Sequence, residues 1–348
     1  MALDIAECEL QLTYMPYDVP KPFQVLALSG GGFRGLYTAK VIADVEREIN
    51  APLASRFDLI TGTSIGGILA LALALEIPAQ EIVDLFVDHG EEIFKKRWSL
   101  VGFLRAPYSP VPLINLLSDT KLFGDRLLGA CKHPVIIPSL NYSTGEPVIF
   151  KTPHHLDFKR DHGHRLVDVA MATSAAPAYF PRHCFNNSQY VDGGLYANAP
   201  GIIGLHEASK FFDQEIENVR LMAVGTMSSR FTVDPQQNRD GGVRDWGGGS
   251  PLKMSRRLFG LSISAQEVLS DFMLGHRLGK HYVHVDDELH DERARAVGLD
   301  IADENAREVL LSAATQRSKV CISKPEFKAF LEHSPSKPVF FYGENAHV

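Results

Sequence analysis

The chain has 348 residues, 45% of them hydrophobic and 22% charged, which supports a sizeable folded core and excludes an intrinsically disordered chain. Acidic residues number 42 against 35 basic ones, and the formal net charge of -7 argues against a nucleic-acid polymer as partner. The four cysteines, Cys8, Cys131, Cys184 and Cys321, are far apart, so neither a disulfide framework nor a zinc knuckle is suggested.

The N-terminus, MALDIAECE, lacks the basic start and the apolar block of a signal peptide. The longest apolar run, residues 65–75, is far shorter than the ~20 residues that are needed to cross a bilayer. We therefore expect a cytoplasmic protein that meets membranes only at their surface.

The first 75 residues contain two strand–glycine turn–helix patterns. Residues 1–22 show no clear period and are expected to form an arm over the core. The apolar run 23–28 predicts a buried strand, and a helix follows from Gly35. Residues 57–61 predict a second buried strand, and residues 65–75 predict a helix that is apolar nearly all round and therefore central. Such alternation predicts an α/β fold with parallel strands.

The rest of the chain adds mostly helices. The further predictions, in order, are a β-hairpin over 134–151, a helix over 166–173, a strand over 220–225, and helices over 253–278 and 302–317. Residues 231–251 are rich in glycine and are expected to form a mobile loop. We thus expect a core over 23–230 with a mostly parallel sheet, and a helical region over 252–348 packed on that core.

Gly62-Thr63-Ser64-Ile65-Gly66 stands between a predicted strand and a predicted helix, the setting of a nucleophile elbow. The glycines permit a sharp turn that projects the Ser64 hydroxyl at a helix N-terminus, whose dipole favours developing negative charge. The alternative is a glycine-flanked serine that caps an ordinary helix. The buried strand before the motif and the apolar helix after it favour the catalytic interpretation.

A second glycine-rich turn, SGGGFRG at residues 29–35, also joins a predicted strand to a predicted helix. Consecutive glycines let the N–H groups of Gly30, Gly31 and Gly32 converge on one oxygen, as an oxyanion hole requires, and Arg34 adds a positive charge. The spacing also matches the dinucleotide fingerprint G-x-G-x-x-G. That fingerprint needs an acidic residue at the end of the next strand, where this chain has the serine elbow instead. A turn without a ligand is the remaining alternative.

YVDGG at residues 190–194 places Asp192 at the end of a predicted strand, followed by two glycines that leave its carboxylate uncovered. Asp-Gly is a common turn dipeptide, so this motif is weak by itself. Its position after the glycine loop and the serine elbow gives it weight.

Together these motifs resemble the patatin-like phospholipases over residues 23–226. SGGGFRG fits the family's loop of three glycines, any residue, Arg and Gly, with Ser29 at the variable first position. GTSIG fits its G-x-S-x-G, DGG fits its D-G-[GA], and TSAAPAYFP at 173–181 is similar to the family's stretch before the aspartate. The resemblance implies a three-layer α/β core.

The resemblance also implies a Ser–Asp dyad without a histidine. Ser64 would attack an ester carbonyl to give an acyl-enzyme, and Asp192 would act as the base, first for Ser64 and then for water. The oxyanion would be held by the glycine loop and Arg34. A carboxylate is a weak base at its reference pKa of ~3.9, so we expect burial to raise the pKa of Asp192. No cofactor is expected for the chemistry.

A Ser–His–Asp hydrolase and a metal enzyme are the alternatives to this dyad. His206 follows Asp192 in the required order but is expected on an ordinary helix. His281 and His284 could face one side of a helix as metal ligands, although no third ligand stands out and no metal site is expected. The remaining candidates lie in a charged loop and are expected to be solvated: His154, His155, His162 and His164.

The whole-chain pattern resembles the patatin-like effectors of bacterial anti-phage (CBASS) systems. The resemblance implies activation by a cyclic dinucleotide from a partner nucleotidyltransferase, homo-oligomerisation on activation, and attack on phospholipids at the inner membrane. A nucleotide with two phosphates needs Arg or Lys. Residues 250–280 carry a local excess of three positive charges, and Arg256 and Arg257 are the candidate nucleotide ligands. A basic face for anionic lipid headgroups, or simple solvation, is equally compatible with the pattern.

Two apolar segments are candidates for membrane contact: residues 98–108 (WSLVGFLRAPY) and the pair Phe211-Phe212. Packing over the core is the alternative for the first segment. At the level of function, a soluble esterase without nucleotide control and a non-catalytic nucleotide sensor are the competing hypotheses, and the presence of Ser64, Arg34 and Asp192 argues against the sensor.

Overall fold

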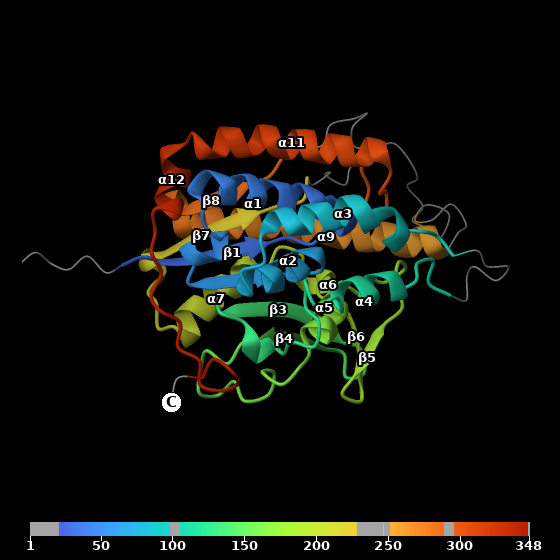
Figure 1. Ribbon diagram of the computed structural model, residues 1–348, viewed down its shortest axis with the longest axis horizontal. Helices are drawn as coiled ribbons and strands as arrows, with labels where there is room; N and C mark the ends of the chain where they lie inside the picture. The colour runs from blue at the N-terminus through green and yellow to red at the C-terminus, as the bar shows by residue number, and fades with distance from the viewer. Residues whose placement is uncertain (1–20, 98–104, 228–245, 247–250, 289–295, 347–348) are drawn as a thin grey trace, which may run out of the picture.

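The computed structural model describes residues 21–97, 105–227, 246, 251–288 and 296–346. Nearly all of the expected arm and of the expected glycine-rich loop lies outside these residues, as do residues 98–104 of the first candidate membrane segment. One sheet runs through the described part, with helices on both of its faces (Figure 1).

The sheet has eight strands in the order β5-β6-β3-β2-β1-β7-β8, with β4 paired to β3. The strands joined by parallel pairing are β1 (Phe23–Leu28), β2 (Leu59–Gly62), β3 (Val135–Asn141), β7 (Val219–Val224) and β8 (Tyr282–Val285). Antiparallel pairs add β4 (Glu146–Lys151), β5 (His183–Phe185) and β6 (Ser188–Asp192). The sheet is thus mostly parallel at its centre, as predicted.

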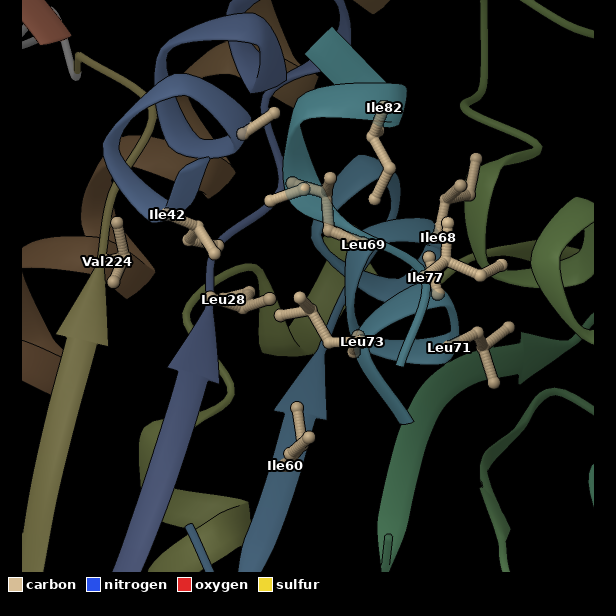
Figure 2. Packing of buried hydrophobic residues seen from close by; sticks show 14 of the residues in the cluster. Leu28, Ile42, Ile60, Ile68, Leu69, Leu71, Leu73, Ile77, Ile82 and Val224 are labelled. Carbon is tan, nitrogen blue, oxygen red and sulfur yellow. The ribbon is translucent and has the colours of Figure 1, made fainter. Parts of the chain in front are cut away.

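Side chains along the strands point alternately to the two faces of the sheet, and this divides the apolar core into two layers. Leu28, Ile60 and Val224 point to the same side and meet the helices drawn above the strands in Figure 2. Their neighbours Val25 and Leu59 belong to a second apolar cluster on the opposite face. Successive strand residues point to opposite faces, so a run of consecutive apolar residues is what a strand covered on both faces requires.

The first face is covered by most of the helices. They are α1 (Gly35–Ile49), α2 (Ile65–Ala74), α3 (Ala79–Ile93), α4 (Val111–Leu117), α5 (Leu166–Ser174), α11 (Glu304–Ile322) and α12 (Pro325–Leu331). Figure 1 shows α11 running along the outside of α1, so the C-terminal region packs on the first helix of the core. Helix α2 is buried along almost its whole length, as its uniformly apolar sequence predicts.

The second face is covered by α7 (Gly201–Phe211) and α9 (Pro251–Leu278), and the short α6 (Gly194–Ala197) packs against α9. The three-layer arrangement confirms the predicted α/β class. No helix among the described residues is long and apolar enough to cross a membrane.

The C-terminal region is helical, as predicted, but it also contains one strand. Strand β8 pairs in parallel with β7 and extends the sheet. The alternative in which His281 and His284 share a helix face is therefore excluded, because α9 ends at Leu278 and His284 lies on β8. Gly279, with φ +51, ends the helix in a left-handed turn, and the β-branched Val283 and Val285 favour a strand after it. The predicted boundary between residues 230 and 252 remains a prediction.

Candidate active site

Ser64 occupies the sharp turn between β2 and α2. Its φ of 56° and ψ of -126° are unusual for a residue with a side chain and mark a strained position. A Cβ at Gly62 would collide with the Gly66 carbonyl oxygen, and a Cβ at Gly66 would collide with that of Leu28. Both glycines of the predicted elbow are therefore required by close backbone approach, which is the physical reason for the G-x-S-x-G pattern.

Hydrogen bonds to neighbouring segments hold the elbow in this strained form. The Ser64 N–H donates to Thr173 Oγ1 at 3.0 Å, and the Thr173 hydroxyl in turn donates to the Pro138 carbonyl at 2.6 Å. The Thr63 hydroxyl donates to the Ala197 carbonyl, also at 2.6 Å. These bonds leave the Ser64 hydroxyl at the N-terminus of α2, where the helix dipole favours negative charge.

Asp192 ends β6, whose pairing with β3 places it opposite Ser139. The Asp192 carboxylate is 1% exposed and accepts a hydrogen bond from the Gly194 N–H at 2.7 Å. Burial raises the pKa of Asp192 to about 7, although hydrogen bonds from the Ser64 side chain and the Gly194 N–H act to lower it. A carboxyl with this pKa beside a serine hydroxyl can exchange a proton with that hydroxyl near neutral pH.

The glycine loop contributes backbone N–H groups to the same place. Gly31 and Gly32 line the pocket that contains Ser64 and Asp192. Within the described part of the chain, the N–H groups of Gly31 and Gly32 have no hydrogen-bond acceptor in the protein. They are the donors that an oxyanion hole needs.

Gly30 and Arg34, predicted to share that role, have other contacts. The Gly30 N–H donates to the Asn198 carbonyl at 3.0 Å. The Arg34 guanidinium, which is buried, donates to the carbonyl oxygens of Gly31 and Met227 at 3.4 and 3.2 Å. Neither residue lines the pocket, so both hold the shape of the loop, and the candidate oxyanion donors narrow to Gly31 and Gly32.

Asn198 is a residue of the site that the sequence analysis did not find. Its side-chain amide donates to the Gly30 carbonyl at 3.2 Å and to Glu267 at 2.8 Å, while its backbone N–H donates to Gln266 at 2.8 Å. It therefore links the glycine loop to α9. No motif surrounds Asn198 in the sequence, and only the folded chain brings it to the loop.

A long apolar pocket opens above Ser64 and Asp192. It contains about 960 Å³ of empty space, part of it open to solvent. Its walls come mainly from α2, α3, α4, α9 and the segment after α5, through side chains that include Ile68, Ile82, Phe86, Leu113, Phe180 and Phe259. The pocket suits a hydrocarbon chain, because hardly any polar group lines it away from its floor.

The described histidines do not contribute to this site. Within the described residues no hydrogen bond joins a histidine to Ser64 or Asp192, and no group of three His, Cys, Asp or Glu side chains could hold a metal ion. His206 lies on α7, as predicted. The expectation that His154 is solvated is wrong: its side chain is fully buried against Glu207, and burial lowers the pKa of His154.

Arg256 and Arg257, the predicted nucleotide ligands, lie next to each other on α9 but have different surroundings. Arg256 forms an ion pair with Asp300 at 3.0 Å and lies over the ring of Tyr179 at 4.3 Å. Arg257 is half-buried on the same helix. The assignment of both to a nucleotide site remains a prediction.

The second candidate for membrane contact does not form an exposed patch. Phe212 packs on Phe23 and on His154, and the ammonium group of Lys151 lies over the ring of Phe211. Large exposed apolar side chains gather instead on α9: Leu258, Val268, Leu269, Phe272 and Met273. Their position on the outer side of a helix was not predicted, because the same helix also has an apolar inner side.

Comparisons with known proteins agree with this geometry. Residues 26–202 match the family described as "Patatin-like phospholipase". A "cGAMP-activated phospholipase" from Pseudomonas aeruginosa is 42% identical over 332 residues, covering 94% of this chain and 97% of the relative. A protein of the same name from Escherichia coli is 35% identical, and the match covers 92% of this chain and 96% of the relative. Another from Vibrio cholerae is also 35% identical, and the match covers 84% of this chain and 89% of the relative. With a serine elbow, an aspartate and a glycine loop assembled at one apolar pocket, the chain belongs to the patatin-like phospholipase family.

Proposed function

We propose that this protein hydrolyses acyl esters of membrane phospholipids, with Ser64 as nucleophile and Asp192 as its base. The observation that carries the proposal is the buried carboxyl of Asp192, whose pKa is raised to about 7 and which has the Ser64 side chain as a hydrogen-bonding partner. Both residues lie at the floor of a pocket with apolar walls that suit an acyl chain.

In the first half of the reaction, Asp192 takes the proton of Ser64 as Oγ bonds to the ester carbonyl carbon. Negative charge moves to the carbonyl oxygen, where the N–H groups of Gly31 and Gly32 stabilise it. The bond to the alcohol oxygen then breaks, and Asp192 returns the proton to that oxygen. The products of this half are a lysolipid and an acyl group on Ser64.

In the second half, water replaces the alcohol. Asp192 takes a proton from the water as its oxygen bonds to the acyl carbon, and the same N–H groups stabilise the oxyanion. When the bond to Ser64 breaks, the proton returns to Oγ and a free fatty acid leaves. Asp192 needs no histidine for these transfers because its own pKa already lies near neutral pH.

The names of the relatives support a switch as part of the function. Relatives called "cGAMP-activated phospholipase" cover most of this chain, and one from Escherichia coli is called "cUMP-AMP-activated phospholipase". On this basis a cyclic dinucleotide from a partner nucleotidyltransferase activates the protein as an anti-phage (CBASS) effector. Activation leads to homo-oligomers that work peripherally at the inner membrane. Arg256 and Arg257 are the candidate nucleotide ligands, and Arg256 would first have to leave Asp300 to bind a phosphate.

The test measures free fatty acid release from phospholipid vesicles, with and without a panel of cyclic dinucleotides. We expect release with one nucleotide, and Ser64→Ala to lower it about 10³-fold or more. Ser334→Ala, at an exposed serine far along the chain from the elbow, is the matched control and should retain full activity. Release without nucleotide would support the phospholipase activity and contradict activation by a nucleotide. Hydrolysis of short soluble esters alone would favour a soluble esterase.

A further inference from the structure

Leu299, in the C-terminal region, contacts the backbone of the glycine loop. The Leu299 carbonyl accepts a hydrogen bond from the Phe33 N–H at 2.9 Å. Gly32 has a φ of +57°, and a Cβ at this position would collide with the Leu299 backbone. Leu299 itself lines the pocket. The backbone that follows the oxyanion donors is therefore in direct contact with a segment from near the other end of the chain.

Asp300, the next residue, fixes this segment through its carboxylate. One carboxylate oxygen accepts hydrogen bonds from the Tyr108 hydroxyl and from the Arg256 guanidinium, the latter at 3.0 Å. The side chains of Arg256 and Asp300 are 23% and 17% exposed, so this ion pair is partly shielded from water. It is a better-defined contact than a pair of exposed charges, which contributes little.

Arg256 and Tyr108 are held in their turn by the segment after α5. The guanidinium of Arg256 lies over the ring of Tyr179 at 4.3 Å, and its Nε donates to the Ala178 carbonyl at 3.4 Å. The ring of Tyr108 stacks on that of Tyr179, and the Tyr108 N–H donates to the Tyr179 carbonyl at 3.2 Å. Asp300 thus sits at the centre of a network built from three separate parts of the chain.

We infer that Asp300 is a positioning residue for the oxyanion hole, a role that rests on the proposed function. The network around Asp300 fixes the Leu299 carbonyl, which orients the peptide between Gly32 and Phe33. The Gly32 N–H belongs to the preceding peptide, whose Gly31 carbonyl accepts the Arg34 N–H at 3.2 Å. The two peptides meet at Gly32, so a rotation of the second peptide acts on the orientation of the first. Catalytic geometry is sensitive to this, since a misplacement of about 1 Å can lower a rate about 10²-fold.

Packing around Phe33 does not perform this task. The Phe33 ring is fully buried and contacts Phe86 and Phe94, and a Cβ at Gly90 would collide with it. These contacts hold the side chain, and the Gly35 N–H donates to the Gly32 carbonyl of the peptide on its N-terminal side. Among the described contacts, the hydrogen bond from the Phe33 N–H to Leu299 is the one that ties this peptide to the C-terminal region.

The experiment compares Asp300→Ala with Asp303→Ala, a matched control nearby. Asp303 caps α11 by accepting the Ala306 N–H at 2.9 Å, so its loss weakens the same region without contact to the glycine loop. Both variants are assayed as full-length protein on a short soluble ester, under the condition that gives the highest wild-type rate. We expect Asp300→Ala to lower kcat by about 10–10²-fold with little change in KM, and Asp303→Ala to leave kcat unchanged.

Amide hydrogen exchange supplies a readout that does not depend on activity. Asp300→Ala should speed exchange at the Phe33 N–H, and Asp303→Ala should not. Asp300→Asn keeps an acceptor for Tyr108 and Arg256 and should recover part of the lost kcat.

The proposal is overturned if Phe33 exchange is the same in Asp300→Ala and wild type, if the two alanine variants lose kcat equally, or if only KM changes. If the wild type shows no hydrolysis that depends on Ser64, the proposed function itself fails and the catalytic role of Asp300 fails with it.

Discussion

Two parts of the molecule place a hydroxyl in line with a proton acceptor. At the first, the Ser64 hydroxyl partners the buried carboxylate of Asp192. At the second, Thr152 Oγ1 lies 2.8 Å from His154 Nδ1, and His154 Nε2 lies 3.1 Å from a carboxylate oxygen of Glu207. By the residue types it brings together, a hydroxyl, a histidine and a carboxylate, the second group is closer to a hydrolase triad than the first.

The surroundings of the two hydroxyls are what distinguish them. Thr152 Oγ1 accepts the Val135 N–H at 2.9 Å and also lies 3.2 Å from the Val135 carbonyl. Its hydrogen bonds therefore stabilise the start of β3. Thr152, His154 and Glu207 are all buried, and Lys151 adds an ion pair to Glu207 at 2.6 Å. Ser64 instead opens on an apolar pocket beside the N–H groups of Gly31 and Gly32, which have no acceptor among the described residues. Access and oxyanion donors, more than a hydroxyl–base contact, distinguish a catalytic site from a structural one.

The largest expected effect comes from the same chemical change at the two sites. Asp192→Asn removes the proposed base, so fatty acid release should fall by about 10²–10⁴-fold. Glu207→Gln also converts a buried carboxylate to an amide, but the rate per folded molecule should stay unchanged. The measurement is kcat on vesicles, normalised to the folded fraction from circular dichroism. Equal losses in the two variants would mean that the buried group takes part in the chemistry.

The next largest effect is on stability, and we expect it at the buried Glu207 group and not at the Ser64 site. Removing one partner of a buried ion pair costs about 3–5 kcal/mol, so Glu207→Ala should lower the free energy of unfolding by that amount. Glu146→Ala, at an exposed glutamate on β4, is the matched control. Urea unfolding measures both variants. A loss in Glu207→Ala no greater than in the control would show that the pair with Lys151 is not a significant source of stability.

The smallest expected effect is graded with pH and concerns Asp192. Since the base must be ionised, kcat/KM should rise through a midpoint near the Asp192 pKa of about 7 and fall about tenfold per pH unit below it. A soluble ester is the substrate, so that lipid charge stays out of the profile. Glu207→Gln should show the same midpoint, and a midpoint near pH 4 would contradict burial as the source of the raised pKa.

Ionisation of Asp192 as pH rises should increase the activity but decrease the stability of the folded protein. The Asp192 pKa rises from 3.8 to about 7 on folding, so the stability that its protonation provides is fully present below pH 3.8 and is lost as pH rises through about 7. Asp192→Asn avoids this loss. The variant should therefore gain stability relative to the wild type as pH rises to 8, which thermal unfolding at several pH values would measure.

The sequence predicted those parts of the site whose reasons are local. Glycines at positions 62 and 66 were expected because a sharp turn needs them, and the structure places them against neighbouring carbonyl groups. The apolar helix after Ser64 and the strand before Asp192 follow equally from nearby residues. Such features depend on a few neighbours along the chain, which a single sequence contains in full.

The parts that were missed depend on contacts between distant segments. Asn198, Leu299 and Asp300 have no motif around them, and their contacts with the glycine loop or with Arg256 exist only after folding. His154 was expected in solvent because its neighbours along the chain are polar, yet Phe212 and Glu207 bury it. A charged stretch indicates exposure only where no residue from a distant segment packs on its side chains and pairs with their polar groups.

The hydrogen bond between Phe33 and Leu299 also bears on the order in which the protein is made. The elbow and the glycine loop are synthesised well before Leu299. During translation the loop lacks the carbonyl that orients it, and α1 lacks its cover by α11. A nascent chain that stops before Leu299 would therefore carry the proposed catalytic residues without their final arrangement. On the proposed function, the hydrolase becomes competent only after Leu299 has reached the glycine loop.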